Sequence, residues 1–257
     1  MNRELKMNTG SVKKKLITFI RCQTKRAGVG RMVIGLSGGV DSAVSVYLAA
    51  AALGPKNVLG LMMPYKTSSP IDTKDARLVV KALGIKSKTI SITPMVDAYF
   101  KKFPKANRVR RGNKMARERM SILYDQSKVF DALVMGTGNK TEILLGYYTL
   151  HGDAACSINA IGSLYKTQVR QLAKSLGVPE GIITKAPSAG LWPGQTDEGE
   201  LGMTYCEVDS LLYYMIDRGY SQSRLAKMGF KKSFIRKVSN RIASTCFKRL
   251  PPAIAVI

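Results

Sequence analysis

Short apolar runs alternate with amphipathic stretches along most of the chain. Four runs have the length and composition of buried strands, at residues 32–36, 58–63, 88–92 and 132–135. Helical patterns lie before, between and after them, at residues 1–31, 41–53, 72–83, 107–130, 164–176 and 205–247. Strands that alternate with helices predict a parallel sheet covered on both faces. We therefore expect a Rossmann-like, three-layer α/β/α fold, in a single domain over residues 1–257, that ends in helices alone.

Two glycine-rich turns follow predicted strands. The first is Ser37-Gly38-Gly39-Val40-Asp41-Ser42, and the second begins Gly136-Thr137-Gly138. Both fall at the carboxyl ends of their strands, which is the edge where ligands bind to parallel sheets. The sequence turns irregular at residues 186–202, with Pro or Gly at positions 187, 190, 193, 194 and 199. A loop of this length in a compact domain is usually functional.

The charge of the chain adds a preference for anionic ligands. The 257 residues include 41 Lys and Arg against 17 Asp and Glu, for a formal charge of +24 and a pI near 10.1. Such a field attracts nucleic acid, nucleotides, phosphorylated metabolites and anionic membrane surfaces. Charge alone therefore leaves several classes of partner open.

Other classes are excluded by what the sequence lacks. The longest apolar stretch, residues 44–53, is too short to span a bilayer, and no signal-type apolar region opens the chain. These observations predict a cytoplasmic protein without a membrane partner. The four cysteines are scattered and His151 is the only histidine, so a zinc ribbon and a histidine-rich metal site are excluded. The cysteines are expected to be small buried hydrophobic residues.

The first turn has the chemistry of a phosphate-binding loop. Its glycines let the backbone approach a ligand, and the following helix presents free N–H groups and a partial positive charge. Ser37 and Ser42 add hydroxyls. The Asp41 carboxylate would repel phosphate unless a cation such as Mg²⁺ lay between them. The turn lacks the Walker A pattern, and a capped helix start without a ligand is the simpler alternative for such a sequence by itself.

The pattern of this turn resembles the pyrophosphatase loop of the ATP-pyrophosphatase (N-type) superfamily. From about residue 12 onward, an ordered set of segments is similar to the ammonia-dependent NAD synthetase family: 117–120, 136–142, 145–153, 164–169, 186–202 and 248–252. The resemblance implies an adenine nucleotide alpha-hydrolase-like fold and an enzyme of NAD biosynthesis. The implied reaction amidates deamido-NAD with ammonia, uses ATP, passes through a NAD-adenylate, and releases AMP and pyrophosphate.

The same resemblance implies roles for individual residues. Asp41 and Lys166 would be catalytic, and Asp41 and Glu142 would hold Mg²⁺. The implied ATP-binding residues are Gly35, Leu36, Ser37, Gly38, Gly39, Val40, Asp41, Ser42, Thr137, Lys166 and Ser188. The implied deamido-NAD-binding residues are Arg117, Asp153, Ser157, Phe247 and Lys248.

The family pattern also implies a homodimer, with deamido-NAD at its interface, so that Arg117 and Lys248 would act across subunits. Family members often carry Lys at the position of Leu150, Asp at that of Ser157 and His at that of Phe247. These departures predict altered contacts to the nicotinate. The chain has no room for the nitrilase-like domain of glutamine-dependent members, which predicts free ammonia as the direct nitrogen donor.

Two other functions are compatible with parts of the sequence. A tRNA-modifying ATP pyrophosphatase is the rival enzyme, because the basic segment 101–119 could follow a phosphate backbone. Such thiolases usually need paired cysteines, which the sequence lacks. A non-enzymatic nucleotide-binding or nucleic-acid-binding module is the other alternative. A solvated helix face is the simpler explanation of the basic segment, so nucleic acid is not expected as a partner.

Overall fold

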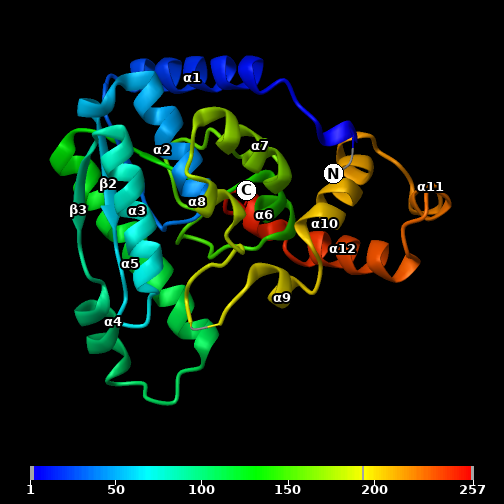
Figure 1. Ribbon diagram of the computed structural model, residues 1–257. Coiled ribbons are helices and arrows are strands. Elements are labelled where there is room, and N and C mark those ends of the chain that lie inside the picture. Colours follow the sequence, from blue (N-terminus) through cyan, green and yellow to red (C-terminus); the bar gives the residue numbers. More distant parts are fainter. Residues whose placement is uncertain (1–2, 193, 256–257) are drawn as a thin grey trace.

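The computed structural model describes residues 3–192 and 194–255, so Pro193 of the predicted loop lies outside the described residues. In the described chain, one parallel sheet has the order β3-β2-β1-β4 (Figure 1). Its strands are β1 (Met32–Gly35), β2 (Val58–Met62), β3 (Lys86–Thr89) and β4 (Leu133–Met135). All three strand pairs are parallel, as the alternation of strands and helices predicts.

The helices of the described chain lie between and after these strands. They are α1 (Thr9–Arg26), α2 (Val40–Leu53), α3 (Pro70–Leu83), α4 (Thr93–Phe100), α5 (Arg108–Phe130), α6 (Lys140–Leu145), α7 (Lys166–Leu176), α8 (Glu180–Thr184), α9 (Asp197–Leu201), α10 (Tyr205–Leu212), α11 (Gln222–Lys227) and α12 (Lys232–Ser244). A π-helical turn, Tyr213–Asp217, continues α10, and 3₁₀ turns lie at Arg3–Leu5, Pro55–Asn57 and Cys246–Arg249.

Side chains of β1 alternate between two apolar cores, one on each face of the sheet. Met32 and Ile34 pack in the core that includes α1, α2, α3 and α7, whereas Val33 packs in the core that includes α4 and α5. All three side chains are fully buried, and burial of each contributes about 1.5–3 kcal/mol. The two cores confirm the predicted three-layer α/β/α fold.

A third apolar cluster lies among the C-terminal helices, on one side of the sheet layers (Figure 1). Its buried members include Leu145 of α6, Tyr205 and Leu211 of α10, and Ile235 and Val238 of α12. The predicted helical end of the fold is therefore present. Because α6 contributes to this cluster, the C-terminal helices are anchored directly beside the turn that follows β4.

The structure corrects several element boundaries. The third strand is predicted at 88–92 but lies at Lys86–Thr89, where all four side chains are exposed. As an edge strand it needs no apolar pattern, and the N–H groups of Ile90 and Ile92 still donate to the carbonyls of Met62, at the end of β2, and Pro64. The predicted irregular stretch 186–202 contains the short helix α9. Helices α4 and α6 are absent from the prediction because each is short.

The expectation of buried cysteines is wrong. Cys22, Cys206 and Cys246 are exposed and Cys156 is half-buried, and all four are free thiols. The three exposed residues lie on α1, on α10 and in the final 3₁₀ turn. In the described ranges, no helix is both long and apolar enough to cross a bilayer.

The sheet order places the two glycine-rich turns side by side. β1 lies between β2 and β4, so the chain crosses the sheet in opposite directions from β1, and this is a topological switch point. The turn after β1 and the turn after β4 both leave the sheet at its carboxyl edge there. The fold therefore positions a site between Gly35 and Met135, the last residues of two paired strands.

Candidate functional site

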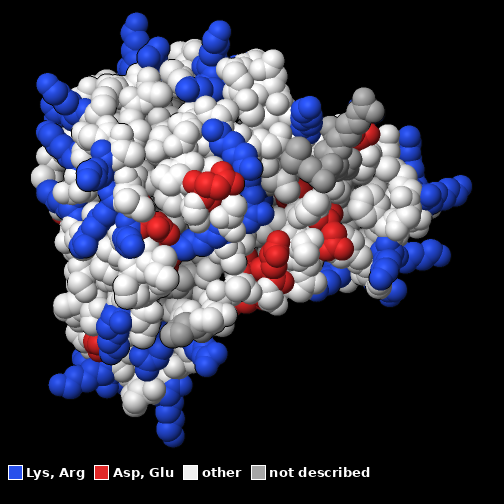
Figure 2. All heavy atoms as spheres, viewed as in Figure 1, with Lys and Arg blue, Asp and Glu red and all other residues white. Residues whose placement is uncertain are grey.

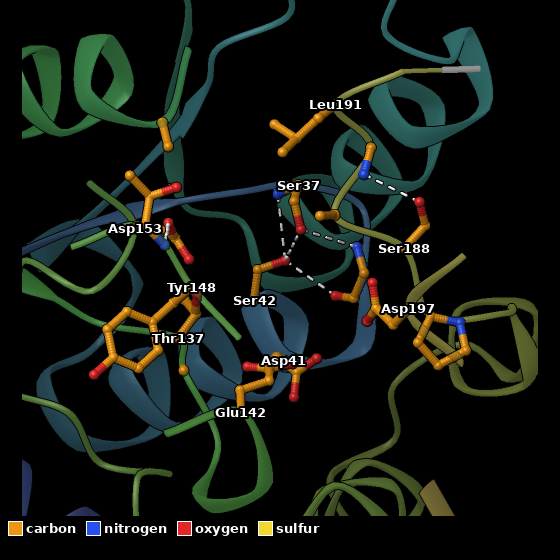
Figure 3. Close-up of a pocket in the computed structure, with 18 of the residues that line it drawn as sticks. Ser37, Asp41, Ser42, Thr137, Glu142, Tyr148, Asp153, Ser188, Leu191 and Asp197 are labelled. Atoms are coloured by element: carbon orange, nitrogen blue, oxygen red, sulfur yellow. Dashed lines mark hydrogen bonds between the residues drawn. The ribbon is translucent and has the colours of Figure 1, made fainter. Parts of the chain in front are cut away.

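A cavity of about 860 Å³ opens at this switch point (Figure 3). That volume suits a ligand of nucleotide size. Its walls come from the turns after β1 and β4, the first residues of α6 and α7, and the loop 185–192. They include ten predicted ATP-binding residues: Gly35, Leu36, Ser37, Gly39, Val40, Asp41, Ser42, Thr137, Lys166 and Ser188. Gly38, the remaining one, is buried within the loop.

The turn after β1 is folded so that its backbone is available to an anion. The Ser42 hydroxyl donates to the Gly39 carbonyl at 3.0 Å and accepts from the Ser37 N–H at 3.3 Å. Gly39 caps α2 without a side-chain hydrogen bond to the first N–H groups of the helix. Free N–H groups and the helix dipole favour an anion at the start of a helix, here the 14-residue α2.

Gly38 is required by the geometry of this turn. Its φ is +78°, in the left-handed region, and a Cβ atom at this position would lie 2.2 Å from the carbonyl oxygen of Asp72. The first residues of α3 therefore lie directly against the turn. Only glycine fits here without moving one of the two segments.

A buried lysine lies between two carboxylates on the floor of the cavity. The Lys166 ammonium is 2.6 Å from Asp41 Oδ2 and 3.1 Å from Glu142 Oε1, and its side chain is 4% exposed. These residues begin three helices, α2, α6 and α7, so three helix starts converge at one point. Glu142 is thus both a first-turn helix acid and a wall of the cavity, next to Asp41 in Figure 3.

Burial shifts the acid–base properties of this cluster. Desolvation raises the pKa of Glu142 to about 7, although the neighbouring Lys166 opposes that shift. Burial alone would lower the pKa of Lys166, but Asp41 and Glu142 outweigh it and the pKa lies above its ordinary value. Lys166 therefore remains a cation in the cavity.

Asn139 is a site residue that the sequence prediction missed. Its side chain is completely buried and donates to Asp41 Oδ1 at 2.9 Å. Its backbone N–H donates to Glu142 Oε2 at 3.2 Å, and its side-chain oxygen accepts from the Glu142 N–H at 3.0 Å. The pattern Asn-x-x-Glu is a capping box, and this local signal could have identified Asn139 as the start of a helix.

A second group of polar residues, also missed, lies beside Lys166. Asp197 is buried, with hydrogen bonds from the Tyr205 hydroxyl at 3.0 Å and the Tyr147 hydroxyl at 3.3 Å. Burial raises its pKa above the ordinary value. The Lys166 ammonium lies 5.0 Å from the centre of the Tyr205 ring. Asp197 stands in a segment that carries the family resemblance, but that pattern gives it no role.

The predicted deamido-NAD residues divide into two groups. Asp153 and Lys248 line the cavity, and Lys248 donates at 2.8 Å to the carbonyls of Gly146 and Tyr148 in the same chain. Arg117, Ser157 and Phe247 are outside the wall of this cavity as the described residues define it. Arg117 is exposed and donates to the Leu150 carbonyl at 3.3 Å. Ser157 is exposed beside β4, and 58% of Phe247 is exposed.

The carboxylate pair is suitable for a divalent cation. Asp41 Oδ2 and Glu142 Oε1 already share one cation, the Lys166 ammonium, and carboxylate oxygens are preferred ligands of Mg²⁺. Within the described ranges, no group of three or more His, Cys, Asp or Glu side chains could hold a metal by itself. A cation at this pair would thus need further oxygen ligands from a bound phosphate.

A parallel sheet with an anion-binding turn at its switch point defines the nucleotide-binding α/β class of proteins. A more specific assignment comes from similarity. The model of the NAD synthase family matches residues 12–252, so the chain belongs to the NAD synthase family. This confirms the family predicted from the sequence.

Individual relatives are similar in sequence to this chain over nearly its whole length. An NH(3)-dependent NAD(+) synthetase of Trichlorobacter lovleyi is 52% identical, with 98% of this chain and 93% of the relative aligned. That of Fusobacterium nucleatum is 49% identical, over 99% and 98% of the two chains.

Two solved structures have the same fold. An NH3-dependent NAD synthetase of Campylobacter jejuni, in complex with nitrate, has a TM-score of 0.84 and 34% identity, over 98% of this chain and all of the other. An NMN synthetase of Francisella tularensis has a TM-score of 0.88 and 33% identity, with the same coverage. The adenine nucleotide alpha-hydrolase-like fold is confirmed.

Proposed function

We propose that this chain is an NH3-dependent NAD synthetase that converts deamido-NAD, ATP and ammonia to NAD, AMP and pyrophosphate. The observation that carries the proposal is the buried Asp41–Lys166–Glu142 cluster at the phosphate-binding turn, in a chain that aligns over its length with relatives of that name. The rival assignment as a tRNA-modifying enzyme is not favoured by any of these relatives.

In this proposal, ATP lies with its phosphates over the start of α2. The free N–H groups of that helix and the hydroxyls of Ser37, Ser42, Thr137 and Ser188 orient the phosphates. Asp41 and Glu142 would hold Mg²⁺, and the bound ion would neutralise phosphate charge. Lys166 stabilises the negative charge that develops on the phosphate oxygens during adenylyl transfer.

The reaction itself needs no protein nucleophile. The nicotinate carboxylate forms a bond to the α-phosphorus, and the bond to pyrophosphate breaks, which gives a NAD-adenylate. Ammonia then attacks the activated carbonyl carbon, loses a proton, and AMP leaves. The residues of the cavity act by positioning the two substrates and by balancing charge.

The deamido-NAD side of the proposal rests on fewer contacts. Asp153 and Lys248 share the cavity with the ATP-binding residues and are the proposed contacts within one chain. Arg117, Ser157 and Phe247 lie outside it, and we propose that the exposed Arg117 serves a homodimer interface. We also propose that residues 1–257 act as one domain in the cytoplasm, which agrees with four free thiols.

The test is an assay of the purified chain with ATP, Mg²⁺, deamido-NAD and ammonium, in which chromatography scores NAD, AMP and pyrophosphate together. We expect the three products in equal amounts. Formation of ADP would exclude adenylyl transfer. Saturable binding of tRNA at physiological salt, without NAD formation, would favour the rival assignment.

The acceptor needs a separate comparison, because the Francisella tularensis relative is named for NMN. Nicotinate mononucleotide should be assayed as acceptor beside deamido-NAD under the same conditions. We expect a higher kcat/KM for deamido-NAD. A higher value for the mononucleotide would keep the reaction class and reassign the substrate.

A further inference from the structure

The Lys166 ammonium lies between the carboxylates of Asp41 and Glu142. It is 2.6 Å from Asp41 Oδ2 and 3.1 Å from Glu142 Oε1. Two largely buried carboxylates that share one contact atom repel each other unless a cation lies between them. In this structure that cation is the ammonium of Lys166. A metal ion that used the same two oxygens would compete with Lys166 for this position.

The other oxygens of the pair are fixed independently of Lys166. Asp41 Oδ1 accepts from the Asn139 side chain at 2.9 Å, and Glu142 Oε2 accepts from the Asn139 N–H at 3.2 Å. Because Asn139 is completely buried, this residue has little freedom to move. Departure of Lys166 would thus leave the two carboxylates in place, with one oxygen of each available.

We propose that Lys166 is the resident cation of the carboxylate pair and that it excludes free divalent metal from the ligand-free protein. Asn139 is the positioning residue that keeps the pair ready for exchange. Metal enters together with nucleotide, because the phosphates give the displaced Lys166 ammonium a new anionic partner. The inference rests on the proposed function, in which ATP and a divalent cation bind at this pair.

Charge explains why nucleotide is required for the exchange. A free ion that displaced Lys166 would leave its ammonium in a buried cavity without its two closest partners, and burial of an unpaired charge is costly. The nearby Asp197 carboxylate already accepts hydrogen bonds from Tyr205 and Tyr147. Binding of metal and binding of nucleotide should therefore be positively coupled, and removal of Lys166 should weaken that coupling.

The test measures Mn²⁺ binding by electron paramagnetic resonance, without nucleotide, in three proteins: wild type, Lys166→Met and Lys140→Met. Lys140 is the matched control, because it lies beside the site but pairs with Asp217 instead. We expect Lys166→Met to bind Mn²⁺ about 5–150-fold more tightly than wild type, the usual range of such couplings. Lys140→Met should match wild type. Equal affinities of Lys166→Met and wild type would overturn the proposal.

Further measurements keep the test decisive. Lys166→Gln, which retains a hydrogen-bond donor, replaces Lys166→Met if circular dichroism shows that the latter does not fold. Adding Asn139→Ala to the folded variant should remove most of the gain, whereas Asn159→Ala, in the adjacent segment, should not. Tight Mn²⁺ binding by ligand-free wild type that is abolished by Asp41→Asn would refute the exchange without any Lys166 variant. NAD formation by wild type tests the proposed function separately from these affinities.

Discussion

Two lysines of this protein each lie between two carboxylates, but in different surroundings. Lys166 contacts Asp41 and Glu142, and 4% of its side chain is exposed. Lys185 contacts Asp72 at 2.7 Å and also Asp75, and 26% of its side chain is exposed. It donates to the Gly38 carbonyl at 3.4 Å as well. The first lysine lies on the floor of the cavity, and the second lies in its wall, against the turn after β1.

The difference shows that the same ion-pair geometry can serve two purposes. The Lys166 cluster joins three helix starts, and its ammonium is almost completely buried, so water cannot replace the two carboxylates around it. Both acids beside Lys185 belong to α3, and water reaches all three side chains, which limits the strength of the contact. Lys185 thus tethers the loop after α8 to α3, whereas Lys166 completes the charge balance of the site.

Figure 2 shows that Lys and Arg side chains cover much of the visible surface, while acidic ones gather in fewer places.

Stability should separate the two lysines most clearly. Lys166→Met leaves two largely buried carboxylates without their cation and should lower the free energy of unfolding by about 3–5 kcal/mol. Lys185→Met should lower it by no more than about 1 kcal/mol. Urea denaturation followed by circular dichroism measures both. Equal losses in the two variants would show that burial does not distinguish these clusters.

Activity should distinguish Asp41, a partner of Lys166, from Asp72, a partner of Lys185. Asp41→Asn removes one of the charges that balance Lys166 and would hold the metal, so kcat should fall by about 10²–10³-fold while the fold survives. Asp72→Asn, at the exposed cluster, should retain kcat within a few-fold. Steady-state NAD formation is the readout. Near-normal turnover of Asp41→Asn would exclude the proposed metal role of that residue.

The pH dependence of stability should reveal the raised pKa of Glu142. Its pKa in the folded protein is raised from the ordinary 4.5 to about 7, so the folded state favours the protonated acid. A raised pKa contributes stability that is complete below pH 4.5 and is lost as the pH rises through about 7. Relative to Glu142→Gln, wild type should thus lose at most about 3 kcal/mol across this window. Denaturant titrations at several pH values measure it. A difference that is constant or increases with pH would contradict the assignment.

The smallest effect on stability and kinetics is expected at Gly38, where the turn after β1 touches Asp72 of the Lys185 cluster. Gly38→Ala places a Cβ against the Asp72 carbonyl, in a left-handed conformation, and should cost about 1–3 kcal/mol of stability. The KM for ATP should rise more than kcat falls, because the turn is displaced and the Lys166 cluster is retained. Gly84→Ala is the matched control for strain alone, since its φ is +62° and no atom lies within 4 Å of the added Cβ. Identical kinetics in both variants would argue against a tight fit at Gly38.

Much of the arrangement at the floor of the cavity could be predicted from the sequence, because local patterns determine it. A strand followed by glycines and a helix start fixes the position of Asp41, and the same logic after β4 brings Glu142 to the same edge of the sheet. The family resemblance adds Lys166. These residues occupy helix starts, which carry clear signals in the sequence.

The rest depends on contacts between distant segments. Asn139 and Asp41 are 98 residues apart, and nothing in either local pattern indicates that their side chains meet. Asp197, the first residue of α9, accepts a hydrogen bond from Tyr205 of α10, and α10 packs against α6 and α7, which periodicity cannot show. Arg117, Ser157 and Phe247 have family positions but no place in this cavity, since their surroundings depend on the packing of other segments.

The distance along the chain between Asp41 and Lys166, 125 residues, has a consequence for biosynthesis. A ribosome that adds about 5–20 residues per second releases the acid roughly 6–25 s before the base that neutralises it. During that interval the phosphate-binding turn can exist without the Lys166 ammonium. Until α7 is translated, the nascent chain therefore holds Asp41 without the lysine that balances its charge in the finished protein.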